Sequence, residues 1–124
     1  MIWEPQIEPT LLDQVDNAME IAQEEVFAPV LAAIPYATDD EAIALANDSK
    51  YGLAGGVWSP DTERATAVAR RLRTGVVSLN NPLVMDFGSP FGGFKQSGLG
   101  REMGPEGLAA YTELQSIIGS PPSP

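Results

Sequence analysis

The sequence predicts an α/β fold built from parallel β-α-β units. Three short apolar segments that resemble buried strands alternate along the chain with two segments that resemble amphipathic helices. The expected strands are residues 29–35, 53–58 and 76–80. This alternation is typical of a parallel sheet with right-handed crossover connections. A length of 124 residues with 44% apolar content suits one domain, which we place over residues 6–118, with a disordered tail at 119–124.

The first strand and the first helix each have a signature in the sequence. Residues 29–35 form an apolar run between two prolines, with the length and flanks of a buried strand. Thr38 and Glu41 then form a capping box that opens a helix. The apolar face of this helix comprises Ala42, Ile43, Leu45 and Ala46. The pattern weakens at Asn47 and Ser49, so we expect the helix to end there.

The second strand, residues 53–58, leads into a second helix. Ser59 can cap this helix and Pro60 can occupy its first position, where a missing N–H does no harm. We expect the helix to run from about Asp61 to Arg73 and to end at Gly75 as a left-handed cap. Its apolar face comprises Ala65, Val68, Ala69 and Leu72.

The last part of the chain contains one long loop. After the strand at 76–80, residues 80–104 are rich in glycine and proline and show no clear period, which in a compact domain indicates a functional or interface loop. A short helix near 105–111 and a final strand near 112–118 complete the expected elements.

Composition excludes several classes of function. The formal charge of -10 would repel nucleic acid and anionic membranes, and we see no secretory signal or membrane-spanning segment, so we expect a cytoplasmic protein. With Cys 0 and His 0, the chain has no thiolate nucleophile, imidazole base or disulfide. We expect no metal site. Ser97 has neither a G-x-S-x-G frame nor a histidine to activate it, and the glycines of the long loop fit neither a P-loop nor a dinucleotide fingerprint.

Four motifs in order give the chain a resemblance to the NAD(P)-dependent aldehyde dehydrogenase family, from about Gln6 to Ile117. They are Ile7-Glu8-Pro9-Thr10, then Glu24-Glu25-Val26-Phe27-Ala28-Pro29-Val30, then Ala46-Asn47-Asp48 with Tyr51-Gly52-Leu53-Ala54, and finally Ser89-Pro90-Phe91-Gly92-Gly93-Phe94-Lys95-Gln96-Ser97-Gly98-Leu99-Gly100-Arg101-Glu102 with Tyr111-Thr112-Glu113 further on. The resemblance implies a partial catalytic domain with a C-terminal oligomerisation strand.

The same resemblance implies a chemistry that this chain cannot complete alone. In the family, a cysteine thiolate attacks the aldehyde, hydride passes to NAD(P)+, and a glutamate-activated water releases the carboxylic acid. This chain has no cysteine. The general-base glutamate, the oxyanion asparagine and the dinucleotide fold lie upstream in the family, in sequence that this chain lacks. We therefore expect an inactive fragment to which no cofactor binds, although NAD or NADP would serve the complete enzyme.

The resemblance assigns cofactor contacts to three residues. Glu25 matches the carboxylate that holds the nicotinamide ribose hydroxyls, Phe27 matches the aromatic beside the nicotinamide, and Leu53 matches a position near the reacting centre. The alternatives are a solvated carboxylate for Glu25 and a core aromatic for Phe27. Ala28 stands where the family usually has glycine, so a positive φ there would cost roughly 1 kcal/mol.

Other residues match the family's substrate and interface positions. Met85 and Phe91 match the aldehyde tunnel, Asn80 matches a position near the reacting centre, and Arg101 and Glu113 match ion pairs near the subunit interface. The alternatives are ordinary loop contacts with the core and exposed ion pairs of little energetic weight. We expect Gly92, Gly93, Gly98 and Gly100 to serve backbone turns.

Two hypotheses of different classes follow. The first is a fragment of an aldehyde dehydrogenase whose uncovered strand edges invite association. Residues 1–5 depart from the family's usual lead-in, which fits truncation. The second is a non-catalytic interaction module that complements a separate N-terminal part or co-assembles with a homologous subunit. Either protein would be a homo-oligomer or the partner of a homologue.

Overall fold

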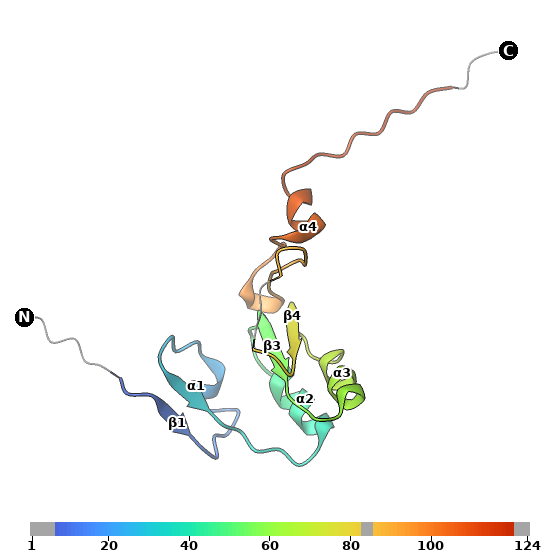
Figure 1. Cartoon of the computed structure of the whole chain (residues 1–124). Coiled ribbons are helices and arrows are strands. Elements are labelled where there is room, and N and C mark those ends of the chain that lie inside the picture. The colour runs from blue at the N-terminus through green and yellow to red at the C-terminus, as the bar shows by residue number, and fades with distance from the viewer. Residues whose placement is uncertain (1–6, 83–85, 121–124) are drawn as a thin grey trace, which may run out of the picture.

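The computed structural model describes residues 7–82 and 86–120, in which short strands alternate with short helices (Figure 1). The strands are β1 (Thr10–Leu12), β2 (Val30–Ala32), β3 (Ala54–Val57) and β4 (Val76–Leu79). The helices are α1 (Glu20–Gln23), α2 (Asp39–Asn47), α3 (Thr62–Ala69) and α4 (Gly104–Ala109), with a 3-10 turn, η1 (Lys95–Ser97), in the long loop. The mixed α/β class is confirmed, with β1 and α1 as additional elements that the sequence did not suggest.

The strands form two separate parallel pairs. Thr10 of β1 lies opposite Val30 of β2, and Ala54 of β3 lies opposite Val76 of β4. Each pair is joined by a crossover that contains a helix, α1 in the first and α3 in the second. The three strands expected from the sequence therefore do not share one sheet, because β2 bonds to β1 and not to β3.

The two longer helices begin at side-chain caps. The Thr38 hydroxyl accepts a hydrogen bond from the Glu41 amide at 3.2 Å, as the capping box requires. The expected second cap was wrong: Asp61, not Ser59, accepts from the Arg64 amide at 3.0 Å and caps α3. The Ser59 hydroxyl instead accepts from the Asp61 amide in a local turn, which leaves Pro60 outside the helix.

The expected end of α3 was also wrong. The helix stops at Ala69 with Arg70 as its cap, and Gly75 does not adopt a positive φ. Gly75 is needed for another reason: a Cβ there would overlap the carbonyl of Gly92, so the start of β4 and the long loop touch through their backbones.

The C-terminal segment does not form the expected strand. The short helix is present as α4, but residues 112–120 are extended without any ladder partner. Leu114, Ile117 and Ile118 are 103%, 90% and 95% exposed. A strand is defined by hydrogen bonds to a neighbour, and the described residues supply none here.

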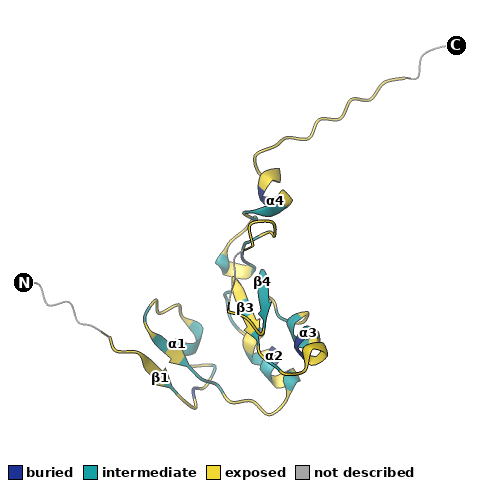
Figure 2. Ribbon diagram, viewed as in Figure 1, coloured by how far each residue is buried: buried dark blue, intermediate teal, exposed yellow. Residues whose placement is uncertain are grey.

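Burial is sparse in the described residues (Figure 2). Their buried hydrophobic side chains are Val15, Ile43 and Ala65. The paired residues Leu11 and Leu31 on adjacent strands are 64% and 66% exposed. The chain thus forms the local elements of an α/β domain while leaving much of their apolar surface uncovered.

Candidate functional site

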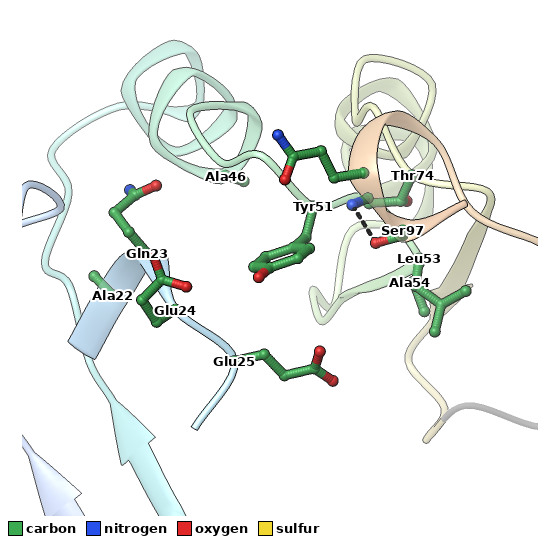
Figure 3. Close-up of a pocket in the computed structure, with 12 residues that line it drawn as sticks. Ala22, Gln23, Glu24, Glu25, Ala46, Tyr51, Leu53, Ala54, Thr74 and Ser97 are labelled. Atoms are coloured by element: carbon green, nitrogen blue, oxygen red, sulfur yellow. Dashed lines mark hydrogen bonds between the residues drawn. The ribbon is translucent and has the colours of Figure 1, made fainter. Parts of the chain in front are cut away.

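A cavity of about 520 Å³ lies between the end of α1 and the start of β3 (Figure 3). One wall is the segment that contains Glu24 and Glu25. The facing wall contains Tyr51 and Leu53 from the connection before β3, and Ser97 from η1. The remaining lining residues are Ala22, Gln23, Ala46, Gly52, Ala54, Thr74 and Gln96.

Hydrogen bonds fix the first wall to the end of α2. The side-chain Nε2 of Gln23 donates to the backbone carbonyl oxygens of Asn17 and Asp48, at 2.8 and 2.9 Å. Asn17 in turn donates to the Asp48 carboxylate at 2.9 Å. The segment that leads to Glu25 is therefore tethered to the rest of the site before the chain turns toward β2.

An ion pair joins the two walls. Lys50 Nζ lies 2.6 Å from Glu24 Oε1, and the Lys50 ammonium also lies 5.4 Å from the centroid of the Tyr51 ring. The carboxylate of Glu24 raises the pKa of Lys50 above its ordinary value. The positive charge at this end of the cavity is therefore retained across the physiological pH range.

The three residues expected at the cofactor differ in position. Glu25 and Leu53 line the cavity from opposite walls, whereas Phe27 lines a smaller neighbouring hollow together with Glu24. Phe27 is 94% exposed and has a φ of 49°. The strained position is thus Phe27 and not Ala28, whose φ is not positive. Alanine costs nothing in backbone strain at that position.

Of the residues expected at the substrate, Asn80 and Phe91 do not line this cavity. The Asn80 side chain accepts from the Ser59 amide at 2.7 Å and donates to the Ser59 carbonyl at 2.8 Å. Phe91 forms an antiparallel bridge with Glu102, with both backbone hydrogen bonds at 2.7 Å. Met85 lies outside the described residues. Both polar groups of the Asn80 side chain are thus hydrogen-bonded to the backbone of Ser59.

The residues expected at an interface do not contact each other. The Arg101 guanidinium donates to the carbonyls of Gly93 and Gly100, at 3.0 and 2.6 Å, and lies 5.3 Å from the centroid of the Phe94 ring. Glu113 lies exposed in the extended C-terminal segment. The ion pairs recorded among the described residues are Lys50 with Glu24, Arg64 with Asp39, and Arg71 with Asp40.

The glycines of the long loop serve the backbone, as expected. Gly98 and Gly100 have φ of 121° and 84°, a region that other residues rarely adopt. A side chain at Gly93 would lie 2.6 Å from the Ser97 side chain. These positions shape the loop that supports one wall of the cavity.

Sequence reasoning missed the residues that hold the walls together, including Gln23, Lys50, Tyr51 and Ser97. Their contacts join positions far apart in the sequence, as in the 2.9 Å hydrogen bond from the Gly52 amide to the Ser97 hydroxyl, 45 residues away (Figure 3). The only available signal was that Tyr51 and Ser97 belong to motifs of the family resemblance.

The described residues contain neither a membrane-spanning helix nor a cluster of metal-ligating side chains. No helix in residues 7–82 or 86–120 has the length and apolarity needed to cross a membrane. Within the same residues, no group of three or more His, Cys, Asp or Glu side chains could hold a metal ion.

Comparison with known proteins assigns a family to this arrangement. The profile described as the aldehyde dehydrogenase family matches residues 5–117. Geranial dehydrogenase of Castellaniella defragrans is 50% identical over 111 residues, which cover 90% of this chain and 23% of that protein. Betaine aldehyde dehydrogenase of Bacillus subtilis is 48% identical over 110 residues, covering 89% of this chain and 22% of that protein. The chain thus spans less than a quarter of these relatives.

Solved structures give the same result. An aldehyde dehydrogenase of Mycobacterium tuberculosis complexed with NAD+ superposes with a TM-score of 0.83 at 54% identity, covering 86% of this chain and 22% of that one. An indole-3-acetaldehyde dehydrogenase of P. syringae in complex with NAD+ gives 0.86 at 50% identity, covering 90% and 22%. A family profile over nearly the whole chain and close structural agreement lead to one conclusion: the chain belongs to the aldehyde dehydrogenase family.

Proposed function

We propose that this chain supplies the C-terminal part of the catalytic domain of an enzyme that oxidises an aldehyde to a carboxylic acid with NAD(P)+. The observation that supports this most directly is the placement of Glu25 and Leu53 on opposite walls of one cavity. NAD+ complexes among the structural relatives agree with a cofactor at this site. The chain contributes one edge of the cofactor site, and the remainder of the site comes from elsewhere.

Glu25 is the residue that suits a cofactor ribose. Its carboxylate accepts hydrogen bonds only, so it can accept from both hydroxyls of a diol, and such bonds are charge-assisted. The exposed ring of Phe27, held at a φ of 49°, offers a flat apolar surface close to it in sequence. A bound nicotinamide would supply the hydride acceptor for the oxidation. The role of this chain's residues is to orient the ring.

The substrate and interface assignments belong to the same proposal. Asn80, Met85 and Phe91 would border the aldehyde path once the rest of a catalytic domain packs against the long loop. Arg101 and Glu113 would form ion pairs with a second subunit, since their charges are not paired with each other here. The extended segment after Tyr111 would gain a ladder partner in the same assembly.

The chain alone is expected to be inactive. It has no cysteine to attack an aldehyde and no histidine to act as a base. The thiolate, the general-base glutamate and the dinucleotide-binding fold must therefore come from another polypeptide or another part of the same one.

The test is complementation. We would express the chain with a Castellaniella geranial dehydrogenase from which the segment that matches this chain has been deleted, and follow reduction of NAD+ with geranial. Activity only in the mixture, lowered at least about tenfold by Glu25→Gln, would support the proposal. The control is Glu20→Gln, which neutralises an exposed carboxylate outside the cavity. Activity of the purified chain alone would refute the argument from the absent cysteine.

The cofactor affinity of the isolated chain gives a second prediction. We expect NAD+ to bind no more tightly than millimolar, because the residues that line the described cavity include two carboxylates and no lysine or arginine to hold the pyrophosphate. Glu25→Gln should then change nothing measurable. Clear micromolar binding in a calorimetric titration would contradict this.

A second candidate function is a non-catalytic module that co-assembles with a homologous subunit. The exposed apolar residues of β1, β2 and the C-terminal segment favour it. Size-exclusion chromatography and pull-down with a full-length homologue distinguish the two functions. Stable association without any gain of activity on complementation would favour the module.

A further inference from the structure

The turn η1 forms hydrogen bonds with the end of α2 and with the connection between α2 and β3. The Lys95 ammonium donates to the carbonyls of Asn47 and Ser49, at 2.8 and 2.9 Å. The Gln96 amide donates to the Lys50 carbonyl at 2.9 Å, and the Ser97 hydroxyl accepts from the Gly52 amide at 2.9 Å. Three consecutive residues of η1 therefore satisfy backbone groups spread over residues 47–52.

The backbone of η1 is shaped for this contact. Lys95 has a φ of 55°, an unfavourable conformation for a residue with a side chain, and its energetic cost must be offset by its contacts. The Phe94 amide next to it donates to the Gly52 carbonyl at 2.8 Å. A lysine that covers the last carbonyls of a helix is also favoured by the helix dipole.

The contacts of η1 extend to the opposite wall of the cavity through Lys50. Its carbonyl accepts a hydrogen bond from the Gln96 amide, and the carbonyls of Asn47 and Ser49, which precede it in the chain, accept from the Lys95 ammonium. The Lys50 ammonium lies 2.6 Å from Glu24, the neighbour of Glu25 in sequence. Hydrogen bonds and one ion pair therefore connect η1 to the segment that contains Glu25.

We propose that η1 is a clasp that sets the separation of the two cavity walls, with Lys95 as a positioning residue that acts on Glu25 through Lys50 and Glu24. The importance of this clasp for cofactor binding rests on the proposed function. Its effect on the geometry of the cavity can be tested without any enzymatic activity. Without the clasp, the 47–52 connection would keep its local structure at each end and lose the bonds that fix Lys50.

The test measures the distance from α1, which leads into the wall that contains Glu25, to α3, which contacts β3 beside the facing wall. The chain has no cysteine, so paired spin labels can be introduced at Glu20→Cys on α1 and Ala67→Cys on α3, both exposed positions. Pulsed electron-electron resonance then gives the distribution of distances between the labels. Lys95→Met removes the ammonium and keeps an apolar stem of similar length. We expect the distribution to broaden about twofold or more, because a wall without its bonds opens locally.

Two variants separate positioning from a loss of structure. Lys95→Arg should restore a narrow distribution, since a guanidinium also donates to two carbonyls. Arg70→Met removes an exposed cation with no hydrogen bond recorded among the described residues, and should leave the distribution unchanged. Ser97→Ala, which removes one acceptor without altering charge, should broaden it to a smaller extent.

The outcomes decide the proposal. If Lys95→Met leaves the distribution as narrow as the parent, or Lys95→Arg fails to restore it while circular dichroism shows intact helices, the clasp is refuted. Failure of the complementation experiment with a clear effect of Lys95→Met would instead leave the clasp standing and remove only the proposed function.

Discussion

Asn80 shows how a single side chain can substitute for backbone. Its φ is 50°, and its amide group bonds both the N–H and the C=O of Ser59, while its own N–H bonds to the Val57 carbonyl at 2.9 Å. These bonds continue the pairing of β3 and β4 by one further step. The residue therefore fixes the direction in which the long loop leaves the sheet.

This arrangement predicts an ordered series of variants at Asn80. Asn80→Gly keeps the backbone conformation and loses two hydrogen bonds, each contributing about 0.5–1.5 kcal/mol. Asn80→Ala loses the same bonds and adds backbone strain of about 1 kcal/mol, so it should be the less stable of the two. Urea unfolding of both variants measures the difference. Equal stabilities would show that the positive φ has no energetic cost here.

The ion pair of Asp39 with Arg64 gives a prediction about pH. Two hydrogen bonds from the Arg64 guanidinium, at 2.7 and 2.5 Å, hold the carboxylate and are the largest cause of its lowered pKa. A carboxyl whose pKa is lower in the folded state stabilises the fold above its ordinary pKa of 3.8, and loses this contribution as pH falls through the lower folded value.

The measurement is a titration of the Asp39 carboxyl carbon by NMR. We expect its midpoint below 3.8 in the parent chain and close to that value in Arg64→Met. Arg70→Met is the matched control, because it removes an arginine from the same part of the chain without touching Asp39. A midpoint that stays low in Arg64→Met would show that another group depresses the pKa.

At the scale of elements, α2 and α3 depend on their N-caps. Thr38→Ala and Asp61→Ala each remove the acceptor for an otherwise unpaired amide and should destabilise the helix by about 1 kcal/mol. Thr62→Ala, at the first position of α3, changes the same kind of residue without losing a cap. Helical circular dichroism during urea titration checks this. An effect of Thr62→Ala as large as that of Thr38→Ala would contradict the role of the cap.

The end of the chain illustrates the limit of local propensity. Residues 112–118 have the composition of a strand, but a strand needs a neighbouring ladder, and the described part of the chain offers none. The side chains of Tyr111 and Leu114 are 88% and 103% exposed for the same reason. An apolar segment in this state is a site for association.

For the whole molecule, net charge and exposed apolar surface have opposite effects on association between copies of the chain. No lysine or arginine precedes Lys50, so all 7 basic residues lie in the later part of the chain, while the net charge is -10. Repulsion between copies should limit association at low salt, and screening should permit it through exposed apolar segments.

We therefore expect self-association that rises with salt. Replacing Leu114, Ile117 and Ile118 with serine should weaken it at every salt concentration, without changing the helical signal. Leu99→Ser is the control, because Leu99 is 101% exposed but lies in the long loop. Sedimentation velocity at low and high salt gives the result. Association that is unaffected by the triple serine variant would place the contact elsewhere, on the β1 and β2 face for example.

Local patterns in the sequence were enough to predict the family, the α/β class and the positions of β2, β3, β4 and α2, and the composition shows that the chain has no cysteine. Apolar runs and a capping box act over a few residues, so they can be seen in the chain. The motif that contains Glu25 was also visible, because motifs are local.

The way in which these elements are joined depends on contacts between residues that are distant in the sequence. It separated the strands into two parallel pairs, moved the cap of α3 to Asp61, engaged the Asn80 side chain with Ser59, and brought η1 onto the end of α2. Each of these depends on competition between donors and acceptors that are adjacent in space. The contact of Lys95 with Asn47 spans 48 residues, and no local pattern in a single sequence specifies such a pair.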